Sequence, residues 1–327
     1  MSLRDILLRE LADGRFHSGQ ELADSTGRSR TAIWKQIQRL QEGLGLGIDA
    51  VRGRGYRLAQ PLELLDAERI RAEFGASTHS LVDGLHVLGS VDSTNTRASA
   101  DLPTESGRAR VWLAEHQTAG RGRRGRSWVS TFGENLYLSL AWRFDLPMSQ
   151  LAGLSLVAGV VVAETLHCEG LQGHALKWPN DVLVDGRKLA GILVDVSGEA
   201  GGPATAVIGV GINLSMPAAD AGAIDQPWTD LRRVGVHLSR NRVAGMLVER
   251  MVEACTTFSS GRLDPFLERW GRFDGLRGSR VAIVRGEHVV EGVYRGIAPS
   301  GALVLEEATG RTEHHAGEVS LRRPGTT

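Results

Sequence analysis

The sequence predicts an α+β protein built from three successive parts. Residues 1–62 contain three short helix patterns followed by two strand patterns. Residues 63–274 mix strand patterns with long apolar helix patterns, which is typical of an α/β body with a mixed sheet. Residues 275–327 contain only short strand patterns separated by glycines. Because 327 residues suffice for two or three domains, we expect one domain in each of these ranges.

The composition is that of a soluble globular protein, with 42% apolar and 23% charged residues and equal numbers of basic and acidic side chains. The longest apolar run, residues 151–166, is shorter than the roughly 20 residues of a membrane-spanning helix, and early acidic residues argue against a signal peptide. Cys168 and Cys255 lie far apart in apolar helix patterns, so we expect two buried free thiols. These features favour a cytoplasmic protein with no membrane partner.

The first part has the pattern of a winged helix-turn-helix, because Ser18 and Glu21 form a capping box and Gly27 ends that short helix. Ser29 begins the next helix, and two strands around the basic residues 52–55 would form the wing. A small helical domain that only packs is the alternative, but the basic outer helix face and basic wing tip favour DNA binding. Since one such domain binds weakly, we expect a dimer on a two-fold DNA site. The expected DNA contacts are Ser29, Arg30, Thr31, Trp34, Lys35, Arg39 and Arg54.

The elements of the body and tail follow from the spacing of apolar residues and from turn signals. In order, we expect a short helix at 66–74, strands at 85–88, 111–114 and 135–140, a buried helix at 151–167, a hairpin at 182–194, a strand at 206–212, and helices at 244–258 and 265–270. Strands at 281–284, 289–294 and 302–306 would form a small β-barrel in the tail.

The body is organised around residues 120–126, where four arginines alternate with three glycines. Because the whole chain is neutral, this segment is a local concentration of positive charge. Glycine lets the backbone approach an anion closely, and arginine grips phosphate or carboxylate with a planar fork. The segment therefore predicts a loop that folds round an anionic ligand.

Two other interpretations of this loop are weaker. Its letters fit the dinucleotide fingerprint G-x-G-x-x-G, but that fingerprint needs a helix beginning at the glycines, and the strand-like residues 135–140 follow instead. A solvated basic loop, or an RNA-binding arm, is the plainer alternative. The sequence contains no Walker A motif, so a nucleotide would be held by other means.

Polar residues at the ends of other strand patterns would complete a site with this loop. The run 93–95, Ser-Thr-Asn, lies at a strand-to-helix junction, where it would act either as a polar clamp for a ligand or only as a helix cap. The run 177–181, Lys-Trp-Pro-Asn-Asp, fixes a lysine, an amide and a carboxylate close together because proline restricts its neighbour. Lys188 returns beside this run on a hairpin with an Asp-Gly turn, although many such lysines are only solvated.

The segment 216–227 is rich in Ala, Asp and Gly, and we expect it to be mobile. Trp228 closes this segment and would either pack or act as a lid that stacks on a base. The recurring groups are cations and amides: Arg121, Arg123, Arg126, Lys177, Lys188, Asn180 and Asn213. This set suits a reaction in which negative charge is neutralised by positioned groups, such as nucleotidyl transfer to a carboxylate. Asp181 would help to hold Mg²⁺ near the phosphates.

Taken together, these motifs resemble the bifunctional biotin–protein ligases that also act as biotin operon repressors. The resemblance covers nearly the whole chain, and the arginine-glycine loop together with the Lys-Trp-Pro-Asn-Asp run is highly specific. It is carried by the helix-turn-helix, residues 93–95, Gln117, and residues 120–126, 177–181, 187–191 and 209–213, and by the terminal strands. The resemblance implies a central domain like that of class II aminoacyl-tRNA synthetases and an SH3-like terminal barrel.

The resemblance also implies a two-step reaction. Biotin and MgATP would give biotinyl-5′-adenylate and pyrophosphate, and the biotinyl group would then pass to a lysine of a biotin carboxyl carrier protein, typically that of acetyl-CoA carboxylase. The adenylate would order loops at a dimer surface, and the dimer would bind operator DNA and repress biotin synthesis genes. Unmodified carrier would compete for the same surface.

Residue roles carry over from the matching motifs. The residues implied in catalysis are Arg121, Arg123, Lys188, Lys177 and Asp181. Those implied in biotin binding are Ser93, Thr94, Asn95, Gln117, Gly120, Arg121, Gly122, Arg123 and Lys188. Those implied in binding ATP and the adenylate are Arg123, Arg126, Trp128, Lys177, Asn180, Asn213 and Trp228, with Trp228 stacking on adenine.

Two alternatives belong to other classes. A lipoate–protein ligase shares the architecture of the catalytic core, but the DNA-binding head and the loop at 120–126 argue against it. A biotin-sensing transcription factor without enzyme activity is the second, and the complete set of Arg121, Arg123, Lys177 and Lys188 argues against a dead site.

Overall fold

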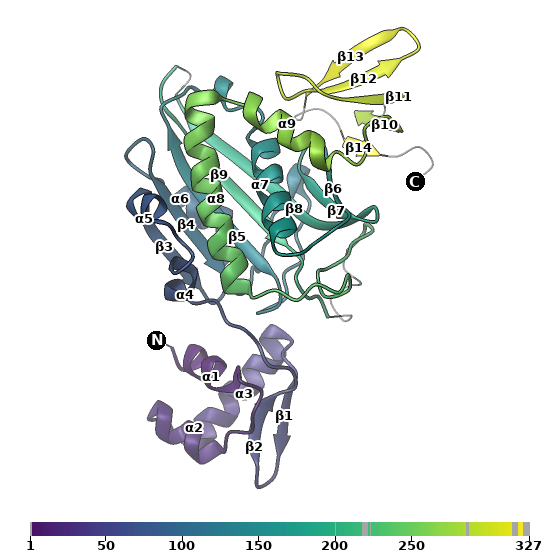
Figure 1. Cartoon of the computed structure of the whole chain (residues 1–327). Coiled ribbons are helices and arrows are strands. Elements are labelled where there is room, and N and C mark those ends of the chain that lie inside the picture. The colour runs from purple at the N-terminus through teal and green to yellow at the C-terminus, as the bar shows by residue number, and fades with distance from the viewer. Residues whose placement is uncertain are drawn as a thin grey trace.

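The computed structural model describes residues 2–199, 201–217, 222, 224–285, 288–315 and 320–322. These residues form a small helical head, a body built on one large sheet, and a tail built on a second sheet (Figure 1). The head lies at one end of the body and the tail at another (Figure 1). The predicted α+β class and the order of its parts are confirmed.

The head is a three-helix unit followed by a β-hairpin, which confirms the predicted winged helix-turn-helix. Ser18 accepts a hydrogen bond from the Glu21 backbone N–H, and the Glu21 carboxylate accepts one from the Ser18 backbone N–H. Gly27 ends the second helix in the left-handed region, with φ 64°, and Ser29 caps the third. The elements are α1 (Leu3–Leu11), α2 (Gly19–Thr26), α3 (Arg30–Leu44), β1 (Ile48–Val51) and β2 (Gly55–Leu58).

The body contains a seven-stranded mixed sheet in the order β3-β4-β5-β9-β8-β7-β6. Only the β3–β4 pair is parallel, and all the other pairs in this sheet are antiparallel. The strands are β3 (Val82–Leu88), β4 (Ala109–Ala114), β5 (Leu136–Phe144), β6 (His174–Lys177), β7 (Asp181–Val184), β8 (Arg187–Gly198) and β9 (Ala204–Ile212).

Helices cover the two faces of this sheet unequally. The long helices α7 (Leu154–Cys168), α8 (Arg240–Gly261) and α9 (Asp264–Phe273) pack with the sheet into the main core (Figure 1). The short helix α6 (Thr94–Ala100) lies on the opposite face, where Ala98 packs against residues of β4, β5 and β9. The sheet therefore keeps part of this second face open beside α6. The remaining helices are α4 (Ala67–Arg71) and α5 (Ala76–Leu81).

The prediction of two buried thiols is half right. Cys255 is fully buried in α8, and this burial raises the pKa of its thiol. Cys168 is exposed, because it is the last residue of α7, where the helix has passed the edge of the core. Among the helices that the structure describes, none is long and apolar enough to cross a membrane.

The tail is a five-stranded antiparallel sheet in the order β13-β12-β11-β10-β14. It shares the main core with the body, and the indole N–H of Trp178 donates to the Gly301 carbonyl at 3.1 Å. The strands are β10 (Arg280–Arg285), β11 (His288–Ile297), β12 (Leu303–Glu307), β13 (Gly310–His314) and β14 (Ser320–Arg322).

A buried ion pair joins the body to the segment that follows the head. The guanidinium of Arg240 lies 2.7 Å from the Glu115 carboxylate, and both side chains are less than 8% exposed. Arg240 also donates to the carbonyl oxygens of Glu63 and Asn135, while Glu115 accepts from the Leu65 backbone N–H. This cluster fixes the end of β4, the start of β5 and the segment after the head at one point.

A second contact between head and body comes from Phe132. Its ring is 2% exposed and belongs to the buried apolar cluster of the head, although the residue lies just after the arginine-glycine loop of the body. A Cβ on the adjacent Gly133 would lie 3.0 Å from Leu62 Cδ1, so the backbone there approaches the head closely. The segment after the loop is therefore packed into the head.

Replacement Arg240→Met should lower the free energy of unfolding by about 3–5 kcal/mol, because it leaves the Glu115 carboxylate buried without its counter-ion. Chemical denaturation of the full chain measures this loss. Arg242→Met is a matched control, since Arg242 pairs with Glu169 from an exposed position two residues along the same helix and its loss should lower the free energy of unfolding far less. Equal losses in the two variants would contradict a special role for the buried pair.

Candidate active site

The floor of the site consists of glycines on the open face of the sheet. Gly191 lies opposite Gly211, and Leu193 lies opposite Gly209, in the β8–β9 register. Side chains alternate along a strand, so these positions face the same side. A Cβ on Gly209 would lie 2.1 Å from Asn95 Oδ1, and a Cβ on Gly211 would lie 2.6 Å from the Trp128 ring. Glycine is therefore required here because other groups lie directly on the backbone.

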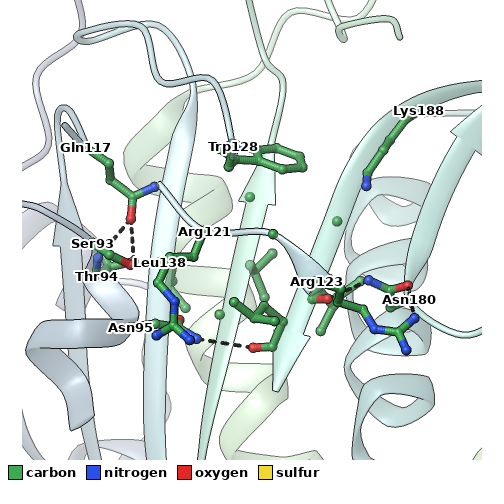
Figure 2. A pocket seen from close by; sticks show the side chains of 17 residues that line it. Ser93, Thr94, Asn95, Gln117, Arg121, Arg123, Trp128, Leu138, Asn180 and Lys188 are labelled. Atoms are coloured by element: carbon green, nitrogen blue, oxygen red, sulfur yellow. Dashed lines mark hydrogen bonds between the residues drawn. The ribbon is translucent and has the colours of Figure 1, made fainter. Parts of the chain in front are cut away.

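Trp128 roofs this glycine floor (Figure 2). Its ring lies against Gly211 and Gly191, and its indole N–H is buried without a hydrogen-bond partner among the described residues. The Lys188 ammonium lies 5.4 Å from the ring centroid, within the range of a cation–π contact. The pocket thus combines flat apolar surface with an indole donor that a ligand would satisfy.

One wall of the pocket is a network of buried polar side chains. Gln117 Oε1 accepts from the Thr94 backbone N–H at 2.8 Å and lies 3.1 Å from the Thr94 hydroxyl. Ser139 Oγ lies 2.6 Å from Asn95 Oδ1 and 2.8 Å from the Thr94 hydroxyl. Ser93 is the N-cap of α6, but its side chain makes no capping hydrogen bond. This geometry favours a polar clamp over simple helix capping for the run 93–95.

The opposite wall carries the cations. Arg123 donates to Asn180 Oδ1 at 3.1 Å (Figure 2), and the Lys188 ammonium lies 2.8 Å from Asp181. Burial and the neighbouring Arg124 lower the pKa of Arg123, while Asp181 raises it. Asn180 is itself fixed, because its amide nitrogen donates to the Ile192 carbonyl. The arrangement places two cations beside one wall of the pocket.

The loop between these walls does not have the structure of a dinucleotide fingerprint. Residues Arg123–Gly125 form a single 3₁₀ turn in which Arg124 adopts φ 57°, and no α-helix begins at the glycines. Gly122 N–H donates to the Arg126 carbonyl, and Trp128 N–H donates to the Gly120 carbonyl. The solvated-loop interpretation describes Arg124 and Arg126, which are exposed, whereas Arg123 is turned into the pocket.

Most of the residues expected at the site line one pocket. These are Ser93, Thr94, Asn95, Gln117, Arg121, Gly122, Arg123, Trp128, Asn180 and Lys188. Six expected residues do not line it: Gly120, Arg126, Lys177, Asp181, Asn213 and Trp228.

The six residues outside the lining differ in their surroundings. Gly120 is buried close to the Trp128 backbone, and Asn213 is buried with its amide donating to the Thr229 carbonyl. Trp228 is held beside Lys188 by backbone pairing, and the Arg233 guanidinium lies 4.0 Å from its ring centroid. Asn213 is placed to support the backbone near the site, while Trp228 lies next to a lining residue.

The sequence reasoning missed Ser139 and Asp195. Ser139 is fully buried behind Thr94 and Asn95, and Asp195 Oδ2 contacts both Asn95 Nδ2 and Arg121. The signal for Ser139 was a small polar residue in an otherwise apolar strand. Asp195 had no comparable signal, because its partners are distant in sequence.

The expectation of a metal ligand concerns Asp181. In the part of the chain that the structure describes, no three His, Cys, Asp or Glu side chains gather in a way that could hold a metal ion. A Mg²⁺ ion that keeps its waters and phosphate ligands needs only one or two protein carboxylates, so Asp181 fits that kind of site. It pairs with Lys188 here, as described above. Of the segment 216–227, which was expected to be mobile, residues 218–221 and 223 lie outside the described residues.

The DNA-reading surface expected in the head is exposed. Trp34 is 50% exposed on α3, and the guanidinium of Arg54, in the turn between β1 and β2, lies 4.1 Å from the centroid of the Phe16 ring. The full expected set, Ser29, Arg30, Thr31, Trp34, Lys35, Arg39 and Arg54, is exposed. A helix face and a wing tip of this kind are accessible to a DNA duplex.

Fold and site together define an adenylate-forming type of ligase with a DNA-binding head, and sequence comparison identifies its family. The chain belongs to the biotin–protein ligase family. The model of the biotin/lipoate A/B protein ligase family matches residues 87–213, an HTH domain model matches residues 3–57, and the biotin protein ligase C-terminal domain model matches residues 277–322.

Relatives extend this assignment over almost the whole chain. The chain is 41% identical to the bifunctional ligase/repressor BirA of Salmonella typhimurium over 97% of this chain and 96% of that protein. It is 34% identical to the biotin–[acetyl-CoA-carboxylase] ligase of Paracoccus denitrificans over 71% of this chain and 98% of that protein. The biotin protein ligase of Aquifex aeolicus, solved with biotin and ATP, superposes with a TM-score of 0.61 at 28% identity, covering 74% of this chain and 99% of that one.

Replacement Gly209→Ala should weaken biotin binding by about tenfold or more, because the new methyl group would collide with the fixed amide of Asn95 and displace it. Isothermal titration calorimetry with biotin measures the change. Gly201→Ala is the control, since a Cβ there meets nothing within 4 Å. Wild-type affinity in Gly209→Ala would mean that Asn95 does not set the shape of the pocket.

Proposed function

We propose that this chain is an ATP-dependent biotin–protein ligase that also represses transcription, with its own adenylate intermediate as co-repressor. The observation that carries the proposal is one pocket in which a buried polar clamp faces a cationic loop, in a chain that also has a winged helix-turn-helix. The clamp suits the neutral head group of biotin, and the cations suit its carboxylate and the phosphates of ATP.

In the first step, a carboxylate oxygen of biotin attacks the α-phosphorus of ATP. The new bond joins the carboxylate to AMP, and the bond to the β-phosphate breaks and releases pyrophosphate. Arg123 and Lys188 neutralise the negative charge that the two anions bring together. The residues Ser93, Thr94, Asn95 and Gln117 hold the head group, so that the carboxylate end points at the cations.

In the second step, the amine of a carrier lysine attacks the acyl carbon of the adenylate. The amide bond forms, AMP leaves with the bonding electrons, and the amine loses a proton. The loop of residues 120–126 and Trp128 limit the access of water to the mixed anhydride until the carrier arrives. The carrier that we propose is the biotin carboxyl carrier domain of acetyl-CoA carboxylase.

Further parts of the proposal concern the metal, the ligand contacts and the assembly. Asp181 would hold the Mg²⁺ of MgATP together with phosphate oxygens, and this ion would offset phosphate charge. Lys177, Arg126 and Asn213 would act on the phosphate side and Trp228 on the adenine. The adenylate-bound chain would dimerise on operator DNA in the cytoplasm.

Mass spectrometry of a biotin carrier domain, incubated with the full chain, MgATP and biotin, tests the ligase. A biotinyl mass gain on one lysine that depends on ATP is expected, and Arg123→Ala should lower the rate at least tenfold and release the adenylate faster. A gain with lipoate alone would indicate a lipoate–protein ligase. No gain with either acid would leave a biotin sensor without enzyme activity.

Replacement of Lys35 and Arg39 by alanine should weaken operator binding and should reduce its salt dependence. With fewer phosphate contacts, fewer counter-ions are released from the DNA on binding. Fluorescence anisotropy with a labelled operator over a salt series measures both effects. The rate of carrier biotinylation is the control and should not change, since both residues lie on the exposed face of the head. An unchanged salt slope would show that α3 does not contact phosphates.

A further inference from the structure

Asp195 connects the polar wall of the pocket to the arginine-glycine loop that faces it. Its Oδ2 atom accepts a hydrogen bond from Asn95 Nδ2 at 3.2 Å, and the same atom lies 3.3 Å from Arg121 Nη1. Asn95 belongs to the polar clamp, whereas Arg121 is the first arginine of the loop. We propose that Asp195 is a positioning residue for adenylate formation, a latch that holds the loop over the pocket before the ligand arrives.

The position of Asp195 follows from the register of the sheet. Gly191, Leu193 and Asp195 alternate along β8 and share the face that carries the pocket. Leu193 lines the pocket, and Asp195 is one step further along the strand, opposite Val207, which packs under α6. Because the carboxylate is carried by a strand that pairs with β9 along this stretch, its place is fixed independently of the loop.

The amide of Asn95 is held on both sides. Ser139 lies 2.6 Å from its Oδ1, while its Nδ2 contacts the Leu193 carbonyl at 3.4 Å and the Asp195 carboxylate. Asp195 therefore makes two kinds of contact. It accepts a hydrogen bond from Asn95, which needs only an acceptor oxygen, and it attracts Arg121, which needs the negative charge of the carboxylate. These two contacts respond differently to substitution, since asparagine at this position keeps an acceptor and removes the charge.

The expected strength of the latch is modest. The Arg121 side chain is 49% exposed and that of Asp195 is 35% exposed, so water screens the pair. An ion pair in such a place shifts an equilibrium by about two- to fivefold, and salt weakens it. A weak latch suits a loop that has to open for biotin and ATP to enter. Arg123 contacts Asn180 across the pocket, so the loop is held at a second point as well.

Hydrogen–deuterium exchange of the full chain without ligand tests the latch directly. In Asp195→Asn, amides of residues 120–128 should exchange about two- to fivefold faster than in the wild type. Salt near 1 M should bring the wild type to the same rate. The matched control is Asp83→Asn. Asp83 lies on the edge strand β3 and forms a comparably exposed ion pair with Arg108, so removing its charge should leave the exchange rate of the loop unchanged. In the working ligase, Asp195→Asn should release the adenylate faster by the same factor.

The latch is refuted if the exchange of residues 120–128 is the same in Asp195→Asn and the wild type, or if the wild-type rate does not depend on salt. A change in Asp195→Ala without one in Asp195→Asn would also overturn it, because Asp195 would then act only through Asn95. This inference rests on the proposed function for its role in adenylate formation, but the exchange experiment does not. Faster loop exchange in a chain that biotinylates nothing would therefore overturn the proposed function and keep the latch.

Discussion

The ion pair between Glu115 and Arg240 is the interaction on which the geometry of the site depends. Removing two charges from water is costly, and the cost is offset only where each charge has good partners. Arg240 meets this condition with bonds to Glu115, to the Glu63 carbonyl and to the Asn135 carbonyl. Glu115 lies two residues before the clamp residue Gln117, so loss of the ion pair with Arg240 would displace the clamp.

One continuous stretch of chain connects the clamp, the loop and the head. It leaves the clamp at Gln117, forms the arginine-glycine loop, and places Trp128 on the glycine floor. It then inserts Phe132 into the core of the head and returns to the clamp at Ser139. Since the head core and the pocket share this stretch, a change in the loop on ligand binding would act on a segment that is packed into the DNA-binding domain. The connection needs no contact between ligand and head.

The sequence predicted the parts of this protein that depend on neighbours along the chain. The capping box of Ser18 and Glu21, the stop at Gly27 and the wing hairpin were all recognised from local patterns, and each is present. The polar run 93–95 and the arginine-glycine loop, which both contribute to the pocket lining, were also recognised, because each is a short run of unusual composition. The exposure of Cys168 was not predicted. How far a helix extends past the buried core depends on which distant elements pack against it.

What the sequence did not predict depends on contacts between distant residues. Glu115 and Arg240 are 125 residues apart, and Asn95 and Asp195 are 100 apart. A single glutamate or aspartate in a strand pattern gives no indication of its partner. The Glu115 carboxylate lies 2.7 Å from Arg240, and nothing near either residue in the sequence indicates this pairing. Register decides such cases, and register is a property of the assembled sheet.

Two cations of the site are paired with carboxylates of the protein itself. Lys188 pairs with Asp181 and Arg121 pairs with Asp195, so two cations of the pocket have a carboxylate partner. Bare cations held this close would repel one another and would destabilise the folded loop. A ligand carboxylate that approaches Lys188 would replace Asp181 as the partner of the ammonium group. This exchange would lower the net electrostatic gain of ligand binding and would leave Asp181 available to a cation. Paired charges therefore make binding weaker than bare cations would, and they limit the repulsion between the cations of the pocket.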